Sequence, residues 1–156
     1  MPIVEPAELR TALAPRARLL GLDLGTKTIG LAVSDSMLMV SSPLETLRRT
    51  KFTADAEALL ALTAEKGVGG LVLGLPRNMD GSEGPRAQST RAFANNMAGK
   101  TDLLITFWDE RLTTAEAERV LIDQADINRK RRGEVIDKMA ASIILQNFLD
   151  FLRNSG

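Results

Sequence analysis

Acidic residues at three places in the chain have neighbours that suit catalysis or metal binding. Asp23 lies in an apolar run of leucine and glycine, Asp109 and Glu110 end a later apolar run, and Asp137 lies near the start of a long apolar C-terminal segment. An ionised carboxylate is costly to bury unless a cation or hydrogen-bond donors compensate its charge. Asp23 therefore indicates either a bound cation or hydrogen bonds to the turn amides around Thr26.

The orientation of Asp23 follows from the strand expected over residues 19–24. Side chains alternate between the two faces of a strand, so Asp23 shares a face with Leu19 and Gly21. A glycine there would leave space beside the carboxylate.

Asp109 and Glu110 are adjacent at the end of a predicted strand. Neighbouring strand residues point to opposite faces, so only one of the two acids is expected to share a site with Asp23. Which one it is stays open at this point. Both acids could instead position Arg111 or cap the following helix.

Asp137 is expected on the inner face of the last helix. At steps of three and four residues it shares a stripe with small and apolar side chains that should pack on the sheet. These are Ala140, Ala141, Ile144, Phe148 and Phe151. The two alanines would let the helix approach closely and bring Asp137 near the strand ends. A carboxylate near a helix start also complements the helix dipole, so a structural role is the alternative.

Three acids from two strands and one helix could converge on divalent cations. In two-metal sites the cations stabilise the attacking and leaving oxygens of phosphoryl transfer. Without metal, clustered carboxylates would repel one another and a phosphodiester. The chain has no histidine and no cysteine, which excludes triad chemistry, the usual zinc sites and disulfides, and favours the cytoplasm. Carboxylate oxygens prefer Mg²⁺ or Mn²⁺.

Composition indicates one soluble globular domain. The 156 residues are 44% hydrophobic and 26% charged, with twenty basic residues balancing twenty acidic ones. This balance argues against a generally basic nucleic-acid-binding surface, although local patches remain possible. No apolar run reaches the roughly 18 residues of a membrane span.

The apolar patterns predict a mixed five-stranded sheet with helices packed on it, an α/β fold. Residues 1–18, with a short helix near residues 6–13, are expected to be an accessory extension of a domain that covers residues 19–156. Strands are expected over residues 19–24, 29–34, 38–47, 71–75 and 103–108, and helices over 53–66, 85–97 and 134–152. Pro43 makes the prediction of the third strand weaker. A capping box at Thr113–Glu116 predicts a further helix, and residues 128–133 are expected to be a mobile charged connection.

Two loops could bind a polyanion. Residues 74–86 follow a strand and precede a helix, so their glycines would permit close backbone approach and the helix start would favour phosphate. Arg77 lies in this loop. The basic run 129–132 could also contact phosphates, although such runs are more often solvated linkers.

Four ordered blocks then resemble a known family. They are GLDLGTKTIGLAVSD at residues 21–35, GLP at 74–76 with DG at 80–81, DERLTT at 109–114, and DKMAA at 137–141. Together they are similar to the YqgF family, also called RuvX, over about residues 19–152. Its members are described as candidate Holliday junction resolvases and as candidate nucleases that process the 5′ end of the 16S ribosomal RNA precursor.

The resemblance implies a ribonuclease H-like fold, a cytoplasmic location and a metal-dependent phosphodiester hydrolase acting in ribosome maturation. Asp23, Glu110 and Asp137 match the family's catalytic acids and would be the ligands of Mg²⁺ or Mn²⁺. The residues expected to contact the nucleic-acid backbone are Lys27, Arg77, Arg111, Arg129, Lys130 and Arg131. The partner would be precursor 16S RNA or the assembling small ribosomal subunit, bound by a monomer or a homodimer.

Three alternatives remain. The substrate could be branched DNA, which a dimer with two sites would resolve symmetrically. The residues Asp23–Thr26, followed by Gly30, also resemble the first phosphate loop of the actin and hexokinase superfamily, although this chain holds only one of the two domains needed. Finally, the fold could serve as a non-catalytic module that recruits a partner during ribosome assembly.

Overall fold

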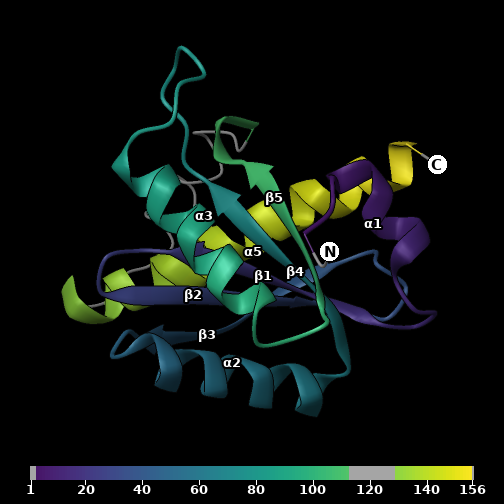
Figure 1. The fold of residues 1–156 in the computed structure, drawn as a ribbon, viewed down its shortest axis with the longest axis horizontal. Coiled ribbons are helices and arrows are strands. Elements are labelled where there is room, and N and C mark those ends of the chain that lie inside the picture. The colour runs from purple at the N-terminus through teal and green to yellow at the C-terminus, as the bar shows by residue number, and fades with distance from the viewer. Residues whose placement is uncertain (1–2, 113–128, 156) are drawn as a thin grey trace.

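The computed structural model describes the backbone of residues 3–112 and 129–155, and the side chains of residues 3–111 and 138–154. The described residues form a five-stranded sheet with helices on both faces (Figure 1). In chain order the elements are α1 (Pro6–Ala12), β1 (Arg18–Leu24), β2 (Thr28–Ser34), β3 (Ser41–Arg48), α2 (Phe52–Lys66), β4 (Val68–Leu75), α3 (Pro85–Ala98), β5 (Leu104–Asp109), the 3-10 helix η1 (Glu110–Leu112) and α5 (Arg129–Ser155). The predicted helix at the capping box lies outside the described residues.

The sheet is mixed, as predicted. Its strand order is β3-β2-β1-β4-β5, in which the first three strands along the chain pair antiparallel through tight connections. β4 pairs parallel with both β1 and β5, and α2 and α3 supply the crossovers that parallel strands require. Because β1, β4 and β5 run parallel, their carboxyl ends all lie at the same end of the sheet.

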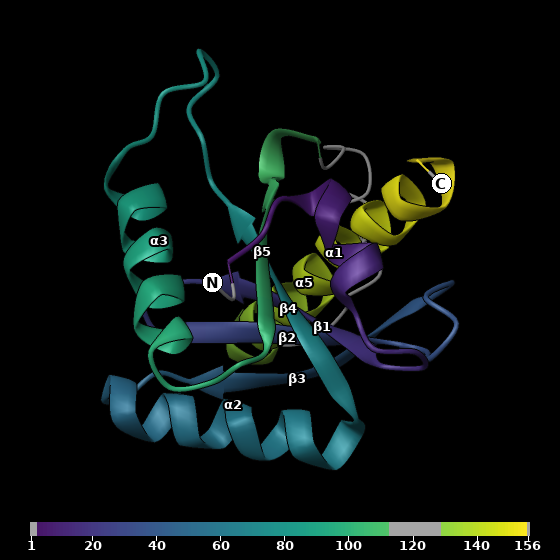
Figure 2. The same cartoon turned by 45° about the vertical axis from the view of Figure 1, so that its right-hand side comes forward.

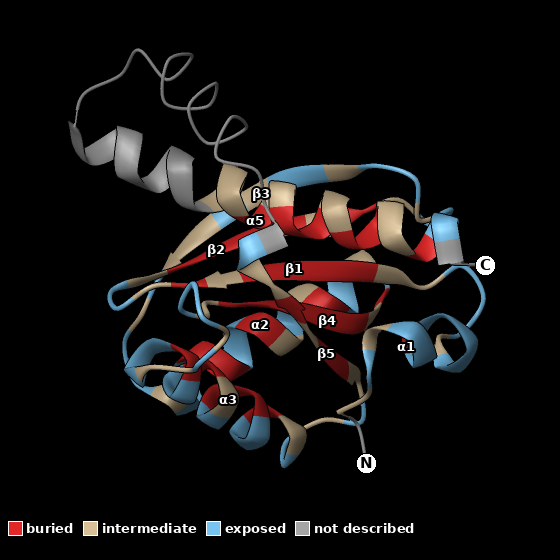
Figure 3. Ribbon diagram, turned by 90° about the horizontal axis from the view of Figure 1, so that it is seen from above, coloured by how far each residue is buried: buried red, intermediate tan, exposed pale blue. Residues whose placement is uncertain are grey.

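Each face of the sheet carries its own hydrophobic cluster (Figure 3). One cluster lies beneath α2 and α3 and includes Leu22, Leu73 and Phe93. The other lies beneath α5 and includes Leu19 and Phe148. β4 is buried along nearly its whole length, which explains why its sequence shows no polar alternation.

β3 is an edge strand, and this position explains how it tolerates Pro43. Its register against β2 shifts beside that residue, where Glu45 pairs with Leu31 and Pro43 pairs with Ala32. Proline is accepted at sheet edges and at bulges because no ladder hydrogen bond from its nitrogen is needed there. The predicted strand is therefore confirmed, with a start at Ser41.

The N-terminal segment packs on the sheet. The predicted helix is confirmed as α1, with Pro6 in its first turn, and Figure 2 shows it beside β5 and α5. Ile3 forms a parallel bridge with Ile105, and Leu9 is fully buried in the cluster under α5. The division of the chain at residue 18 stays a prediction.

α5 begins at Arg129, so the expected mobile connection over residues 129–133 is wrong. Arginine and lysine are good helix formers, and one interior glycine, Gly133, costs only about 1 kcal/mol relative to alanine. Further along, Ala141, Ile144 and Phe148 are buried, as the predicted stripe requires. Among the described helices, none is both long and apolar enough to cross a bilayer.

Candidate active site

Asp23 lies half-buried at the end of β1, on the face that α5 covers. The position of Gly21 establishes this face. A Cβ atom built on Gly21 would lie 2.9 Å from the Cβ of Leu145 and 3.1 Å from the main-chain oxygen of Ala141. Asp23 follows two residues later and shares that face. The space beside Gly21 is therefore taken by the backbone of α5.

Glu110 is the member of the acidic pair that lies on this same face. A Cβ built on Gly74 of β4 would lie 2.7 Å from Oε1 of Glu110 and 2.7 Å from Cδ1 of Ile144 in α5. The Glu110 carboxylate thus occupies the space over Gly74, beside α5. Because glycine has no side chain, the acid can reach across the strand end.

The strand register then relates Asp23 to Glu110. Leu22 of β1 pairs with Leu73 of β4, so the next step along the two parallel strands brings Asp23 level with Gly74. Adjacent strands lie about 4.8 Å apart. Asp23 and Glu110 therefore come from opposite sides of Gly74 on one face of the sheet. This is the arrangement that a shared carboxylate site needs.

Asp109 instead holds Arg111. The Arg111 Nε donates to both carboxylate oxygens, at 3.1 and 3.0 Å, and its NH2 group donates to Oδ2 at 2.7 Å. The side-chain hydrogen bond from Arg111 holds the pKa of Asp109 below its usual value, and the same contact raises the pKa of Arg111. The two adjacent acids therefore make different contacts: Asp109 binds Arg111, whereas Glu110 lies over Gly74.

Asp137 lies in α5, one turn before Ala141, whose main-chain oxygen approaches Gly21. Its side chain lies outside the described residues. Among the side chains that are described, no group of three histidine, cysteine, aspartate or glutamate residues could hold a metal ion. The three-acid cluster therefore stays a prediction.

The basic residues predicted to contact nucleic acid differ in their burial and in their contacts within the protein. Lys27 is exposed in the β1–β2 turn. Arg77 is half-buried, its NH2 group lies 3.5 Å from Oε2 of Glu83, and its Nε is buried without a hydrogen-bond partner among the described residues. Arg77 thus supports its own loop. Arg129, Lys130 and Arg131 lie in the first turn of α5, with side chains outside the described residues.

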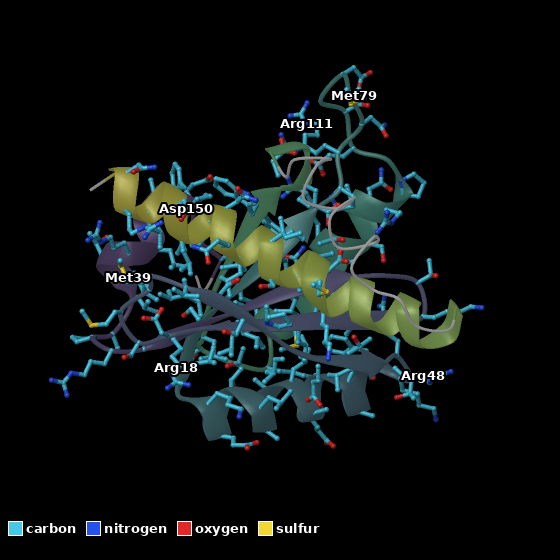
Figure 4. The ribbon with its side chains drawn as sticks, turned by 180° about the vertical axis from the view of Figure 1, so that it is seen from behind. Arg18, Met39, Arg48, Met79, Arg111 and Asp150 are labelled. Carbon is cyan, nitrogen blue, oxygen red and sulfur yellow. The ribbon has the colours of Figure 1, made fainter. Side chains whose placement is uncertain are left out.

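The loop between β4 and α3 projects beside Arg111 (Figures 1 and 4). Within it, the Ser82 amide and hydroxyl donate to Oδ1 of Asp80 at 2.9 and 2.6 Å, and these bonds lower the pKa of Asp80. Arg111 NH1 would lie 3.6 Å from a Cβ on Gly81, whose φ of 89° favours glycine. The loop, whose Met79 is 93% exposed, therefore borders the pair formed by Asp109 and Arg111.

Two further arginines, Arg49 and Arg86, lie close to the end of β1. They line a cleft beside Leu24 on the face that α2 and α3 cover. The sequence contained one signal for Arg86: it lies in the first turn of α3, where a cation opposes the helix dipole. Arg49 follows an edge strand and shows no comparable signal.

The chain matches the family model of RuvX, described as a Holliday junction resolvase, over residues 17–151. The chain belongs to the RuvX family. A relative from Ruegeria pomeroyi is 62% identical over 94% of this chain and 95% of its own length. One from Paramagnetospirillum magneticum is 60% identical over 96% of each chain. Both are named as proposed pre-16S rRNA nucleases. RuvX membership confirms the expected nuclease class.

Two solved structures share the fold of this chain. RuvC of Thermus thermophilus, in complex with a Holliday junction, aligns with a TM-score of 0.55 at 10% identity, over 88% of this chain and 96% of that chain. The fowlpox virus resolvase aligns with a TM-score of 0.53 at 8% identity, over 86% and 98%. These likenesses confirm the ribonuclease H-like fold predicted for this RuvX family member.

Proposed function

We propose that this RuvX family member is a metal-dependent endonuclease that matures the 5′ end of precursor 16S ribosomal RNA in the cytoplasm. Asp23, Glu110 and Asp137 would be its catalytic acids. The observation that carries the proposal is the placement of Asp23 and Glu110 on either side of Gly74, on one face of the sheet. The RNA substrate is supported by the names of relatives with about 60% identity.

The described donors fit a hard divalent cation. Asp23 and Glu110 approach from both sides of Gly74, and a cation bound between two carboxylates offsets their mutual repulsion. Oxygen ligands suit Mg²⁺ or Mn²⁺. Asp23, Glu110 and Asp137 would hold the ion, which when bound would stabilise charge on the phosphate oxygens.

The protein's own groups would orient the acids and the substrate. Ile144 and the bare surface of Gly74 confine the Glu110 carboxylate. Asp109 fixes the guanidinium of Arg111 through a forked contact, and that side chain borders the projecting loop. Lys27 and Arg111 would contact the backbone of the bound strand on two sides of the acids. Confinement of this kind keeps reacting groups in a productive geometry.

The test compares wild-type protein, Asp23→Asn and the control Asp102→Asn, which removes the same charge from an exposed position. Each is incubated with precursor RNA spanning the 5′ end of 16S RNA, in magnesium, in manganese or with chelator. We expect metal-dependent cutting by wild type and Asp102→Asn, and none by Asp23→Asn with an unchanged circular dichroism spectrum. Full metal-dependent activity in Asp23→Asn would contradict the proposed acid set.

Branched DNA is the second candidate substrate, favoured by the description of the RuvX family. Symmetric resolution of a four-way junction needs two sites, and therefore a dimer. A four-way DNA junction is accordingly included in the same assay, with the protein's mass in solution measured in parallel. Cutting of the junction by a dimer would select DNA. If neither substrate is cut, the non-catalytic role in ribosome assembly is the remaining reading.

A further inference from the structure

A cleft opens where β1 ends, on the face of the sheet opposite the carboxylates. Its volume is about 470 Å³, and it lies between the β3–α2 connection and the start of α3. Arg49 and Arg86 line it together with the hydroxyl-bearing residues Thr26, Thr50 and Ser89. None of the described residues that line the cleft is acidic. The cleft therefore has a positive lining, although the chain as a whole carries no net charge.

The two arginines are held in place by the main chain at the end of β1. Arg49 NH1 donates to the oxygen of Gly25 at 2.6 Å, and its guanidinium lies 5.9 Å from the ring centroid of Phe93. Arg86 NH2 donates to the oxygen of Leu24 at 3.4 Å. A guanidinium has five N–H donors, so each arginine keeps most of its donors for a ligand.

The charge of the cleft lining comes from these two arginines. Both guanidinium groups belong to residues that line one cleft, so two like charges border the same space and repel each other. Arg86 also lies in the first turn of α3, where the helix dipole disfavours a cation. If the arginines only anchored the strand end, neutral donors would suffice. An anion in the cleft would relieve both unfavourable interactions.

We propose that the cleft binds a phosphate group of the nucleic acid on which the enzyme acts, a step that rests on the proposed function. Guanidinium groups bind phosphate with charge-assisted, often bidentate hydrogen bonds, and hydroxyl groups add further donors. Contacts of this kind position a strand without reading its sequence. A strand that crosses the β1–β2 turn, where Lys27 is exposed, would reach Asp23 on one face and the cleft on the other.

The test measures binding in chelator, where the metal-dependent reaction does not run. Fluorescence anisotropy gives the affinity for precursor RNA and for a four-way DNA junction over a range of salt concentrations. The variants are Arg86→Gln, Arg86→Lys and the control Arg18→Gln. Arg18 lies at the start of β1, and Figure 4 shows it toward the opposite end of the sheet from Arg48, the neighbour of Arg49.

We expect Arg86→Gln to weaken binding about fivefold to twentyfold and to lower the slope of log K against log salt by about 0.7 to 0.9, the loss of one phosphate contact. Arg86→Lys should keep most of that slope because it keeps the charge. Ser89→Asp, at an exposed position, places a repelling charge in the cleft and should weaken binding further. It provides a second readout if Arg86→Gln folds poorly.

Equal affinity and salt slope for Arg86→Gln, Ser89→Asp and Arg18→Gln would overturn the proposal, even if wild-type protein cuts RNA as expected. Conversely, weaker binding by Arg86→Gln and Ser89→Asp than by Arg18→Gln, without any cleavage by wild type, would support the cleft and contradict the proposed activity. Titration with inorganic phosphate separates the sources of the ligand. Shifts of the Gly25 and Thr26 amide resonances that Arg86→Gln abolishes, with unchanged nucleic-acid affinity, would support a small phosphate compound and overturn the nucleic-acid source.

Discussion

The two faces of the sheet use the same strands in different ways. On the face beneath α2 and α3, β1 and β4 present large side chains, including Leu22 and Leu73, which are fully buried. On the face beneath α5, the neighbouring positions Gly21 and Gly74 present no side chain, and α5 and the Glu110 carboxylate occupy the space. At these positions one face is filled by the strands' own residues, whereas the other is left open for groups from elsewhere in the chain.

Because of this difference, side chains on one face mainly stabilise the fold, whereas glycines on the other face let acidic groups be positioned. Burial of a leucine side chain stabilises the fold by about 1.5–3 kcal/mol, whereas glycine in a strand costs about 0.5–1 kcal/mol relative to alanine. The glycines of β1 and β4 therefore give up stability. As a result, the helix that carries Asp137 and the 3-10 helix that carries Glu110 can approach the backbone of these strands. Substitutions on the two faces should accordingly affect different measurements.

The largest effect is expected on the filled face. Leu73→Ala should lower the free energy of unfolding by about 2–5 kcal/mol, because it leaves a cavity in a fully buried cluster. Cleavage per folded molecule should stay unchanged. Urea denaturation and an activity assay measure the two quantities. Val40→Ala, at a position that is 57% exposed, is the control and should change neither. Loss of activity in folded Leu73→Ala would break the separation between the faces.

Gly74→Ala should reduce cleavage about a hundredfold with little loss of stability. Its methyl group would meet the ends of two flexible side chains, Glu110 and Ile144, so the fold can adjust but the carboxylate must move. A displacement of about 1 Å at a reacting group can cost a factor of about 10² in rate. Single-turnover cleavage measures the effect. Gly99→Ala is the matched control, since a Cβ there meets the main-chain oxygen of Asn96 at an ordinary 3.5 Å. Normal cleavage by Gly74→Ala would show that Glu110 does not act from this position.

Gly21→Ala should show the reverse of Gly74→Ala, because it should mainly lower stability. Its effect on stability should be smaller than that of Leu73→Ala. The added methyl group would meet the Cβ of Leu145 and the main-chain oxygen of Ala141, neither of which can swing aside. α5 must therefore shift, which should cost about 1–3 kcal/mol of unfolding free energy. Thermal and urea denaturation of this variant beside Gly74→Ala measure the difference. An unchanged unfolding free energy would mean that α5 packs less closely than the structure has it.

Most of the fold could be predicted because its signals are local. Apolar runs identify the strands, Gly67 ends α2 in a left-handed conformation with φ of 68°, and Pro85 opens α3. The start of α5 was the error, because a charged run with a glycine resembles a connection until helix propensity is weighed. Pro43 weakened the prediction of β3, since only the tertiary structure shows that this strand lies at the edge.

The candidate site was predicted less completely. Residue types identified Asp23 and the acidic pair, but they could not choose between Asp109 and Glu110. That choice depends on contacts with Gly74, Ile144 and Arg111, which come from other elements or from the turn after β5. The cleft of Arg49 and Arg86 was missed because its residues come from three separate segments.

By itself, the sequence determined which residue types are available and which elements carry them. With no histidine or cysteine, acid-base and metal chemistry falls to carboxylates, and the periodicity of apolar residues places Asp23 in a strand and Asp137 in a helix. Only the tertiary structure decided that Glu110 lies over Gly74, that Asp109 holds Arg111, and that two arginines line one cleft at the end of β1. The physical reason is how far apart along the chain the interacting residues lie. Periodicity depends on neighbours along the chain, whereas these contacts depend on strand register and helix packing between distant segments.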